Sequence, residues 1–189
     1  YAYYHILMTC GPAILVGDEI FESNLEGPAY NTYRATYDET VEYICSELET
    51  AAAYLPLKAS IAQFERPTKG AAYALIARLR LHAASPLFNG TSTARLYFGN
   101  WKRTYDKEYY VNQNYSEEKW ALAAAACKRV IDMNVYELFT VSKDQNTPQL
   151  PAGVPTENFP DGAGGIDPFK SYSYMFTGDE PFKNNNEII

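Results

Sequence analysis

Long hydrophobic runs are absent from this sequence. The longest apolar stretch is interrupted by Arg78 and Arg80, and no run reaches the roughly 18 residues needed to span a bilayer. We therefore expect no membrane-spanning helix in these residues. Basic charge is also scarce, because 16 Lys and Arg stand against 23 Asp and Glu, for a net charge of −7. Proteins that bind nucleic acid carry clustered basic residues, so we expect no nucleic-acid partner.

Cysteine and histidine are few. The three cysteines cannot all pair, and Cys45 and Cys127 fall in helical apolar patterns, where cysteine usually packs as a small hydrophobe. His5 and His82 lie in similar contexts, so we expect no metal site and no cofactor. The sequence LMTC ending at Cys10 lacks the basic and long apolar segments of a lipoprotein signal, and we assign no lipid to this cysteine.

Catalytic motifs are missing as well. The sequence contains no GxSxG, HExxH or CxxC pattern and no glycine-rich phosphate loop. We therefore expect a protein that is not an enzyme. A glycoside hydrolase would need two carboxylates at a fixed separation across a cleft, and a linear sequence cannot exclude that arrangement.

The most regular stretch that is present runs from Pro67 to Phe88, PTKGAAYALIARLRLHAASPLF. Thr68 can cap a helix that Pro86 ends, and alanine and leucine cover nearly its whole circumference. A helix that is apolar all round is buried, so we expect a central packing element.

Two further helices are predicted around this one. Thr36 and Glu39 form a capping-box pattern, and the apolar stripe that follows ends at Pro56. With the central helix it should form an antiparallel helical hairpin over residues 36–86, with Leu48 and Leu79 in its core. A third helix is expected over residues 116–133. The fold class is thus mainly α, with helical hairpins like those of tetratricopeptide repeats and long irregular loops.

Aromatic residues are abundant, with 17 Tyr, 9 Phe and 2 Trp. Many lie in two segments that do not fit the helical plan, an aromatic loop over residues 87–115 and a Pro/Gly-rich loop region over residues 140–186. Sugar rings carry an apolar face that stacks on such side chains. The candidate ligand-binding residues in the aromatic loop are Trp101, Tyr97, Tyr105, Tyr109 and Tyr110. The alternative is that these rings only pin the loop onto the helices.

The central helix motif resembles the most characteristic helix of the SusD/RagB family of outer-membrane nutrient-binding lipoproteins of Bacteroidetes. Supporting matches, in the order and spacing of that family, are GPAILV at 11–16, YRATYDETVEYICSELETAAAYLP at 33–56, YSEEKWALAAAACKRVID at 115–132 and the NNNEII ending. Family members are several times longer, so the resemblance implies a single SusD-like domain fragment, residues 1–189, from the interior of a longer chain.

The resemblance also implies a function. SusD-like proteins bind glycans without catalysis on an aromatic surface and deliver them to a TonB-dependent SusC-type outer-membrane transporter. The helical scaffold would then serve the transporter contact. The protein would be a surface-exposed lipoprotein of the outer membrane, attached only through a lipid anchor upstream of Tyr1. Some members take up other nutrients, such as peptides. A helical-repeat interaction scaffold without a small ligand, and less favourably a glycoside hydrolase, remain as alternatives.

Overall fold

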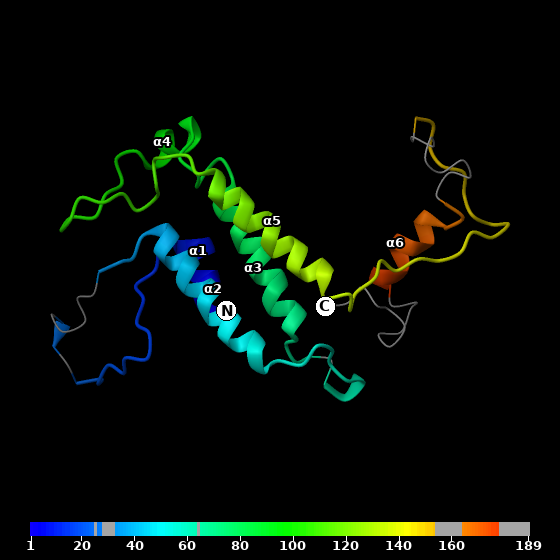
Figure 1. Cartoon of the computed structure of the whole chain (residues 1–189), viewed down its shortest axis with the longest axis horizontal. Helices are drawn as coiled ribbons and strands as arrows, with labels where there is room; N and C mark the ends of the chain where they lie inside the picture. Colours follow the sequence, from blue (N-terminus) through cyan, green and yellow to red (C-terminus); the bar gives the residue numbers. More distant parts are fainter. Residues whose placement is uncertain (25, 28–32, 64, 154–163, 178–189) are drawn as a thin grey trace. The chain divides into compact units, whose positions relative to one another are not determined.

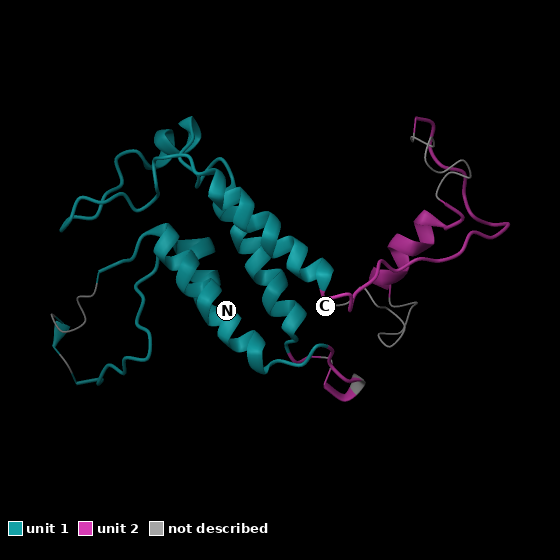
Figure 2. Ribbon diagram, in the orientation of Figure 1, with its two compact units in different colours: residues 1–57, 67–132 teal, residues 58–66, 133–189 magenta. Residues whose placement is uncertain are grey.

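The computed structural model describes residues 1–24, 26–27, 33–63, 65–153 and 164–177. It divides into two compact units (Figure 2). We call Tyr1–Leu57 with Pro67–Asp132 the helical unit, and Lys58–Arg66 with Met133–Ile189 the second unit.

All regular elements in the described ranges are helices, which confirms the mainly α fold class. No helix there is both long and apolar enough to cross a membrane. The helical unit contains α1 (Ala2–Cys10), α2 (Tyr37–Tyr54), α3 (Lys69–Ala84), α4 (Ser92–Phe98) and α5 (Glu117–Asp132).

The starts of α2 and α3 follow from local hydrogen bonds. The Thr36 hydroxyl accepts from the Glu39 amide at 3.1 Å, and the Glu39 carboxylate accepts from the Thr36 amide at 2.7 Å, so the predicted capping box is present. Thr68 caps α3 by accepting from the Ala71 amide at 3.1 Å. The chain reverses between them, and α2 and α3 run antiparallel as expected (Figure 1).

The core of the helical unit lies between α1, α2 and α3. Leu79 is fully buried, and Leu48 is half-buried against the same cluster, as the sequence predicted. The rest of the buried cluster consists of residues from α1, α2, α3 and the aromatic loop: Tyr4, Leu7, Tyr37, Val41, Ile44, Cys45, Ile76, Ala83 and Val111. Burying large apolar side chains of this kind supplies most of the free energy of folding.

The third predicted helix forms, but its apolar stripe is not covered. Within α5 only Ala123 is buried, whereas Trp120 is 41% and Ile131 73% exposed. Cys127, expected to pack as a small hydrophobe, is also exposed. The expected packing of Cys127 is therefore wrong, and most of the apolar stripe of α5 is exposed, because α5 contacts α3 along only part of its circumference.

Two short α-helices were missed, as was the 3₁₀ helix η2 (Ile61–Gln63). The aromatic loop contains α4, which Thr91 caps, and the Pro/Gly-rich region contains α6 (Pro168–Thr177) in the second unit. Asp167, fully buried, accepts the Lys170 amide at 2.9 Å and thereby starts α6. Both segments are therefore less irregular than predicted. Phe159, Phe182 and the NNNEII ending lie outside the described residues.

Candidate functional site

The aromatic loop folds back on itself after α4 and is fixed to the start of α2. The Tyr110 amide donates to the Trp101 carbonyl at 3.1 Å, and the Arg103 amide donates to the Glu108 carbonyl at 2.7 Å. The Tyr37 amide, at the first residue of α2, donates to the Tyr110 carbonyl at 2.7 Å. These bonds satisfy backbone groups that a loop would otherwise leave to water, so the aromatic side chains stand on an ordered backbone.

Arg103 adds a side-chain anchor to this loop. Its Nε donates to Asp106 at 3.1 Å, its Nη1 donates to Glu39 at 3.1 Å, and its Nη2 contacts Asp106 at 2.7 Å and also Glu108. The residue is only 7% exposed. Because Glu39 also belongs to the capping box, the guanidinium ties the loop to the N-terminus of α2.

Trp101 and Tyr110 form the inner part of the aromatic surface. Their rings lie 4.8 Å apart, and the Trp101 ring also lies 6.0 Å from that of Phe98. A β-carbon added at Gly11 would lie 3.3 Å from the indole, so α1 ends directly against it. Both Trp101 and Tyr110 are half-buried, which leaves part of each ring accessible.

The other three candidate rings lie outside the contact between Trp101 and Tyr110: those of Tyr97, Tyr105 and Tyr109. Tyr97, on α4, is 68% exposed and Tyr105 is 49% exposed. Tyr109 is half-buried, and the Lys102 ammonium lies 4.2 Å from its ring centre. The structure thus brings Trp101 and Tyr110 into ring contact. It places Tyr97, Tyr105 and Tyr109 elsewhere on the same loop.

One exposed aromatic residue of this surface was not among the candidates. Tyr33 lies just before α2, is 66% exposed, and its ring centre is 4.1 Å from that of Tyr105. Sequence reasoning missed it because 72 residues separate the two tyrosines. The available signal was its position three residues before the Thr36 cap, which fixes where the chain enters α2.

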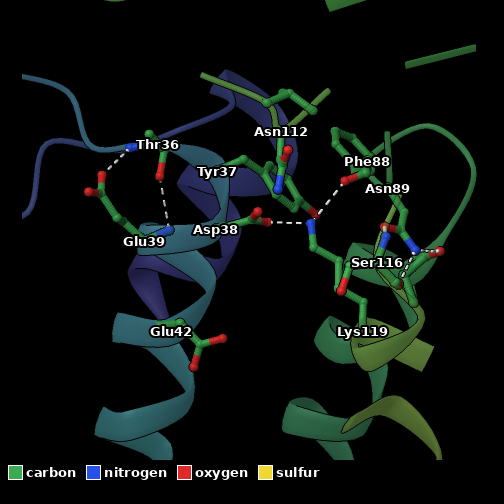
Figure 3. Close-up of polar contacts among 12 residues, drawn as sticks. Thr36, Tyr37, Asp38, Glu39, Glu42, Phe88, Asn89, Asn112, Ser116 and Lys119 are labelled. Atoms are coloured by element: carbon green, nitrogen blue, oxygen red, sulfur yellow. Dashed lines mark hydrogen bonds and ion pairs between the residues drawn. The ribbon is translucent and has the colours of Figure 1, made fainter. Parts of the chain in front are cut away.

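A separate polar cluster lies between the starts of α2 and α5 (Figure 3). The Lys119 ammonium donates to Asp38 at 2.6 Å and to the Phe88 carbonyl at 3.0 Å. The Asn89 side chain accepts from the Ser116 amide at 2.8 Å and donates to the Ser116 carbonyl at 2.9 Å. A cavity of about 250 Å³ beside this cluster is lined in part by two ion pairs, Asp38 with Lys119 and Glu42 with Arg80.

The pKa shifts of four carboxyl groups bear on the alternative that the protein is a glycoside hydrolase. A hydrogen bond from the Thr36 amide lowers the pKa of Glu39. Lys170 lowers the pKa of Asp144 through its side chain and that of Asp167 through its backbone amide. Burial raises the pKa of Asp106, but hydrogen bonds from the Glu108 amide and from Arg103 outweigh it and the pKa is again lowered. A general acid of a glycosidase needs a raised pKa. Within the described ranges, no group of three or more potential metal ligands occurs.

Comparisons with known proteins found one matching family and several similar solved structures. Residues 1–81, which include α1, α2 and most of α3, match the SusD-like family described as "Starch-binding associating with outer membrane". The solved structure of BT4246 has a TM-score of 0.65 and 29% identity, covering 82% of this chain and 27% of that one. Its selenomethionine form has a TM-score of 0.60 and 26% identity, covering 87% and 27%.

A SusD-like protein from Bacteroides fragilis is also similar, with a TM-score of 0.47 and 20% identity over 72% of this chain and 19% of that one. No curated protein matches the chain. The chain thus spans 27% of the length of BT4246. The family match over residues 1–81 and the likeness of the fold to BT4246 both support the resemblance of this chain to the SusD/RagB family.

Proposed function

We propose that this protein binds oligosaccharides at the cell surface without cleaving them, and delivers them to a SusC-type TonB-dependent transporter. The observation that carries the proposal is the exposure of Tyr97 and Tyr105 on a loop whose backbone is fixed to α2. A pyranose needs a flat apolar face held in place, because an aromatic ring that must first be ordered loses binding free energy to entropy.

The aromatic loop also carries polar groups for the hydroxyl rim of a sugar. Asn100, next to Trp101 in the chain, is exposed, and so is Asn112, which lines the cavity between α2 and α5, whereas the Asp106 carboxylate is held by Arg103. Half-buried Trp101, Tyr109 and Tyr110 would form the floor of the site. Amide and carboxylate groups beside aromatic faces suit a ligand with C–H faces and hydroxyl edges.

Cleavage of the glycan is not part of the proposal. A hydrolase would need a carboxyl group whose pKa is raised, so that it stays protonated near neutral pH. Among the described residues, the carboxyl groups with a shifted pKa all have it lowered. Asp38 and Glu42, on the cavity between α2 and α5, are paired with Lys119 and Arg80.

A second role, protein contact, is favoured by α5. Trp120, Leu122 and Ile131 are 41%, 39% and 73% exposed on this helix, and exposed apolar residues grouped on one element favour a protein partner. The scaffold alternative and the glycan-binding role are therefore compatible. In our proposal the aromatic loop holds the glycan and the helices contact the transporter.

The family is described as associating with the outer membrane, and we propose that this protein does so as a surface-exposed lipoprotein, with its lipid anchor upstream of Tyr1. Labelling cells with a palmitate analogue, followed by protease treatment of intact cells, tests both parts. A labelled, protease-sensitive protein supports them. An unlabelled protein contradicts the anchor, and a protease-resistant one contradicts the surface position.

A glycan array probed with the full chain tests the binding role first, and calorimetry with maltoheptaose follows, since the family is described as starch-binding. Tyr105→Ala should weaken glycan binding and leave co-purification of the transporter intact. Ile131→Glu should do the reverse. An array without any bound glycan would remove the proposal, and equal effects of both variants on both readouts would contradict the separation of the two surfaces.

A further inference from the structure

Three side chains from two distant segments form a stack that rises from the interior to the surface. The Arg103 guanidinium lies over the Tyr105 ring, 5.2 Å from its centre, and the Tyr33 ring lies 4.1 Å from that of Tyr105 with the planes tilted by 41°. Exposure rises along the stack, from 7% for Arg103 to 49% for Tyr105 and 66% for Tyr33. The outermost ring is thus the one most available to a ligand.

The base of the stack is held rigidly. Arg103 uses Nε and both terminal nitrogens on three carboxylates, those of Asp106, Glu39 and Glu108. A planar fork with this many partners cannot rotate without breaking several charge-assisted hydrogen bonds. Tyr105 lies in the same tight turn, between Arg103 and Asp106, so its ring is positioned by this anchor.

We propose that Tyr33 is a sugar-stacking residue of the glycan site and that Arg103 is a positioning residue, which holds Tyr105 as the support for the Tyr33 ring. This inference rests on the proposed glycan-binding function and names a subsite for it. The ligand group that it takes is a neutral pyranose. The Arg103 charge is already matched by three carboxylates, so this part of the surface offers no unpaired guanidinium to a uronate or a sulfate.

The geometry has a physical advantage for binding. A lone exposed tyrosine turns about two side-chain torsions and must be ordered when a sugar stacks on it. Contact with Tyr105 restricts the Tyr33 ring before the ligand arrives, and aromatic pairs of this kind are themselves attractive. The restriction should appear as tighter binding rather than as greater stability of the fold, since Tyr33 is mostly exposed.

The test is calorimetry of maltoheptaose, or of another glycan that the array identifies, with the full chain. Tyr33→Ala should weaken binding about tenfold or more, as loss of an aromatic stacking partner does. Tyr33→Phe keeps the ring and should stay within about twofold of the unaltered protein. The matched control is Tyr54→Ala, which removes an 87% exposed tyrosine at the end of α2 and should leave the affinity unchanged.

The positioning role of Arg103 is tested with a separate variant. Arg103→Lys keeps the charge but has one nitrogen in place of the fork, so it should weaken binding several-fold although Tyr33 is still present. Circular dichroism at the titration temperature verifies that the helices of this variant remain. Unchanged affinity in a folded Arg103→Lys protein would overturn the positioning role.

Two further results separate the inference from the function on which it rests. If the unaltered protein binds the glycan and Tyr33→Ala binds equally well, the Tyr33 subsite is wrong and the glycan-binding function stands. If the unaltered protein binds no glycan on the array, the function fails and the subsite fails with it.

Discussion

The backbone of Gly90 passes so close to Asn114 that a β-carbon on Gly90 would lie 2.0 Å from the Asn114 carbonyl carbon. Gly90 has a φ of +57°, in the left-handed region that favours glycine. Next to it, Asn89 forms two hydrogen bonds with Ser116, at the start of α5. The two ends of the aromatic loop, after α3 and before α5, are therefore packed tightly against each other. This contact fixes the base of the loop and so limits where its rings lie.

Gly90→Ala should destabilise the protein by more than about 2 kcal/mol, because it adds left-handed strain and a backbone clash. Gly17→Ala is the matched control, since Gly17 has a similar φ of +61° and nothing within 4 Å of an added β-carbon. It should cost only about 1 kcal/mol. Denaturant melts measure both, and equal losses would show that the contact with Asn114 relaxes freely.

Leu79→Ala should cost about 2 to 5 kcal/mol, the usual range for a buried leucine, because Leu79 is fully buried between the helices. Leu81→Ala, on the same helix at 50% exposure, should cost less than about 1 kcal/mol. Urea unfolding gives both values. A Leu79 loss below about 0.5 kcal/mol would contradict a central role for α3.

His82 should make stability depend on pH. Burial, with the charge of Arg78, lowers the pKa of His82, whose Nδ1 is hydrogen-bonded to the Tyr37 hydroxyl at 2.9 Å. The folded state then binds this proton less readily than the unfolded state does. Its stabilising contribution is present above the unfolded pKa of about 6.5 and is lost as pH falls toward the lower folded value.

Thermal melts at pH 8, 6 and 5 measure this dependence. His82→Gln should flatten the change between pH 8 and pH 5 that the unaltered protein shows. Carboxyl groups such as Glu39 titrate at lower pH and contribute below that window, since their pKa is lowered. An identical pH profile in the variant would mean that His82 does not couple to folding.

Trp101→Ala should weaken glycan binding by about 1 to 3 kcal/mol, as truncation of an aromatic anchor does. It should also cost at least about 1 kcal/mol of stability, because the indole packs against Phe98 and Tyr110 and lies close to Gly11 at the end of α1. Tyr97→Ala, at 68% exposure, should leave stability within about 0.5 kcal/mol.

Denaturant melts and glycan titrations of Trp101→Ala and Tyr97→Ala distinguish a structural role of each ring from direct contact with the glycan. Loss of stability without loss of affinity in Trp101→Ala would make the tryptophan purely structural. The glycan site would then lie on Tyr97 and Tyr105.

Local signals in the sequence were enough to predict the helical scaffold. The capping box of Thr36 and Glu39, the cap at Thr68 and the proline at Pro56 act within a few residues, and apolar spacing along a helix needs no distant partner to be recognised. Short helices such as α4 escaped, because seven residues carry too little periodicity. The family resemblance was likewise contained in contiguous motifs.

Which aromatic rings face solvent, and which rings support them, depends on packing between distant segments. Trp101 and Tyr110 are alike in sequence context to Tyr105, yet the first two pack against each other and are half-buried, with Trp101 also next to the end of α1. The pairing of Tyr33 with Tyr105 and the ion pair of Arg103 with Glu39 join segments 72 and 64 residues apart. Such contacts have no period and no local signal, since they exist only after α2 and the aromatic loop have packed together.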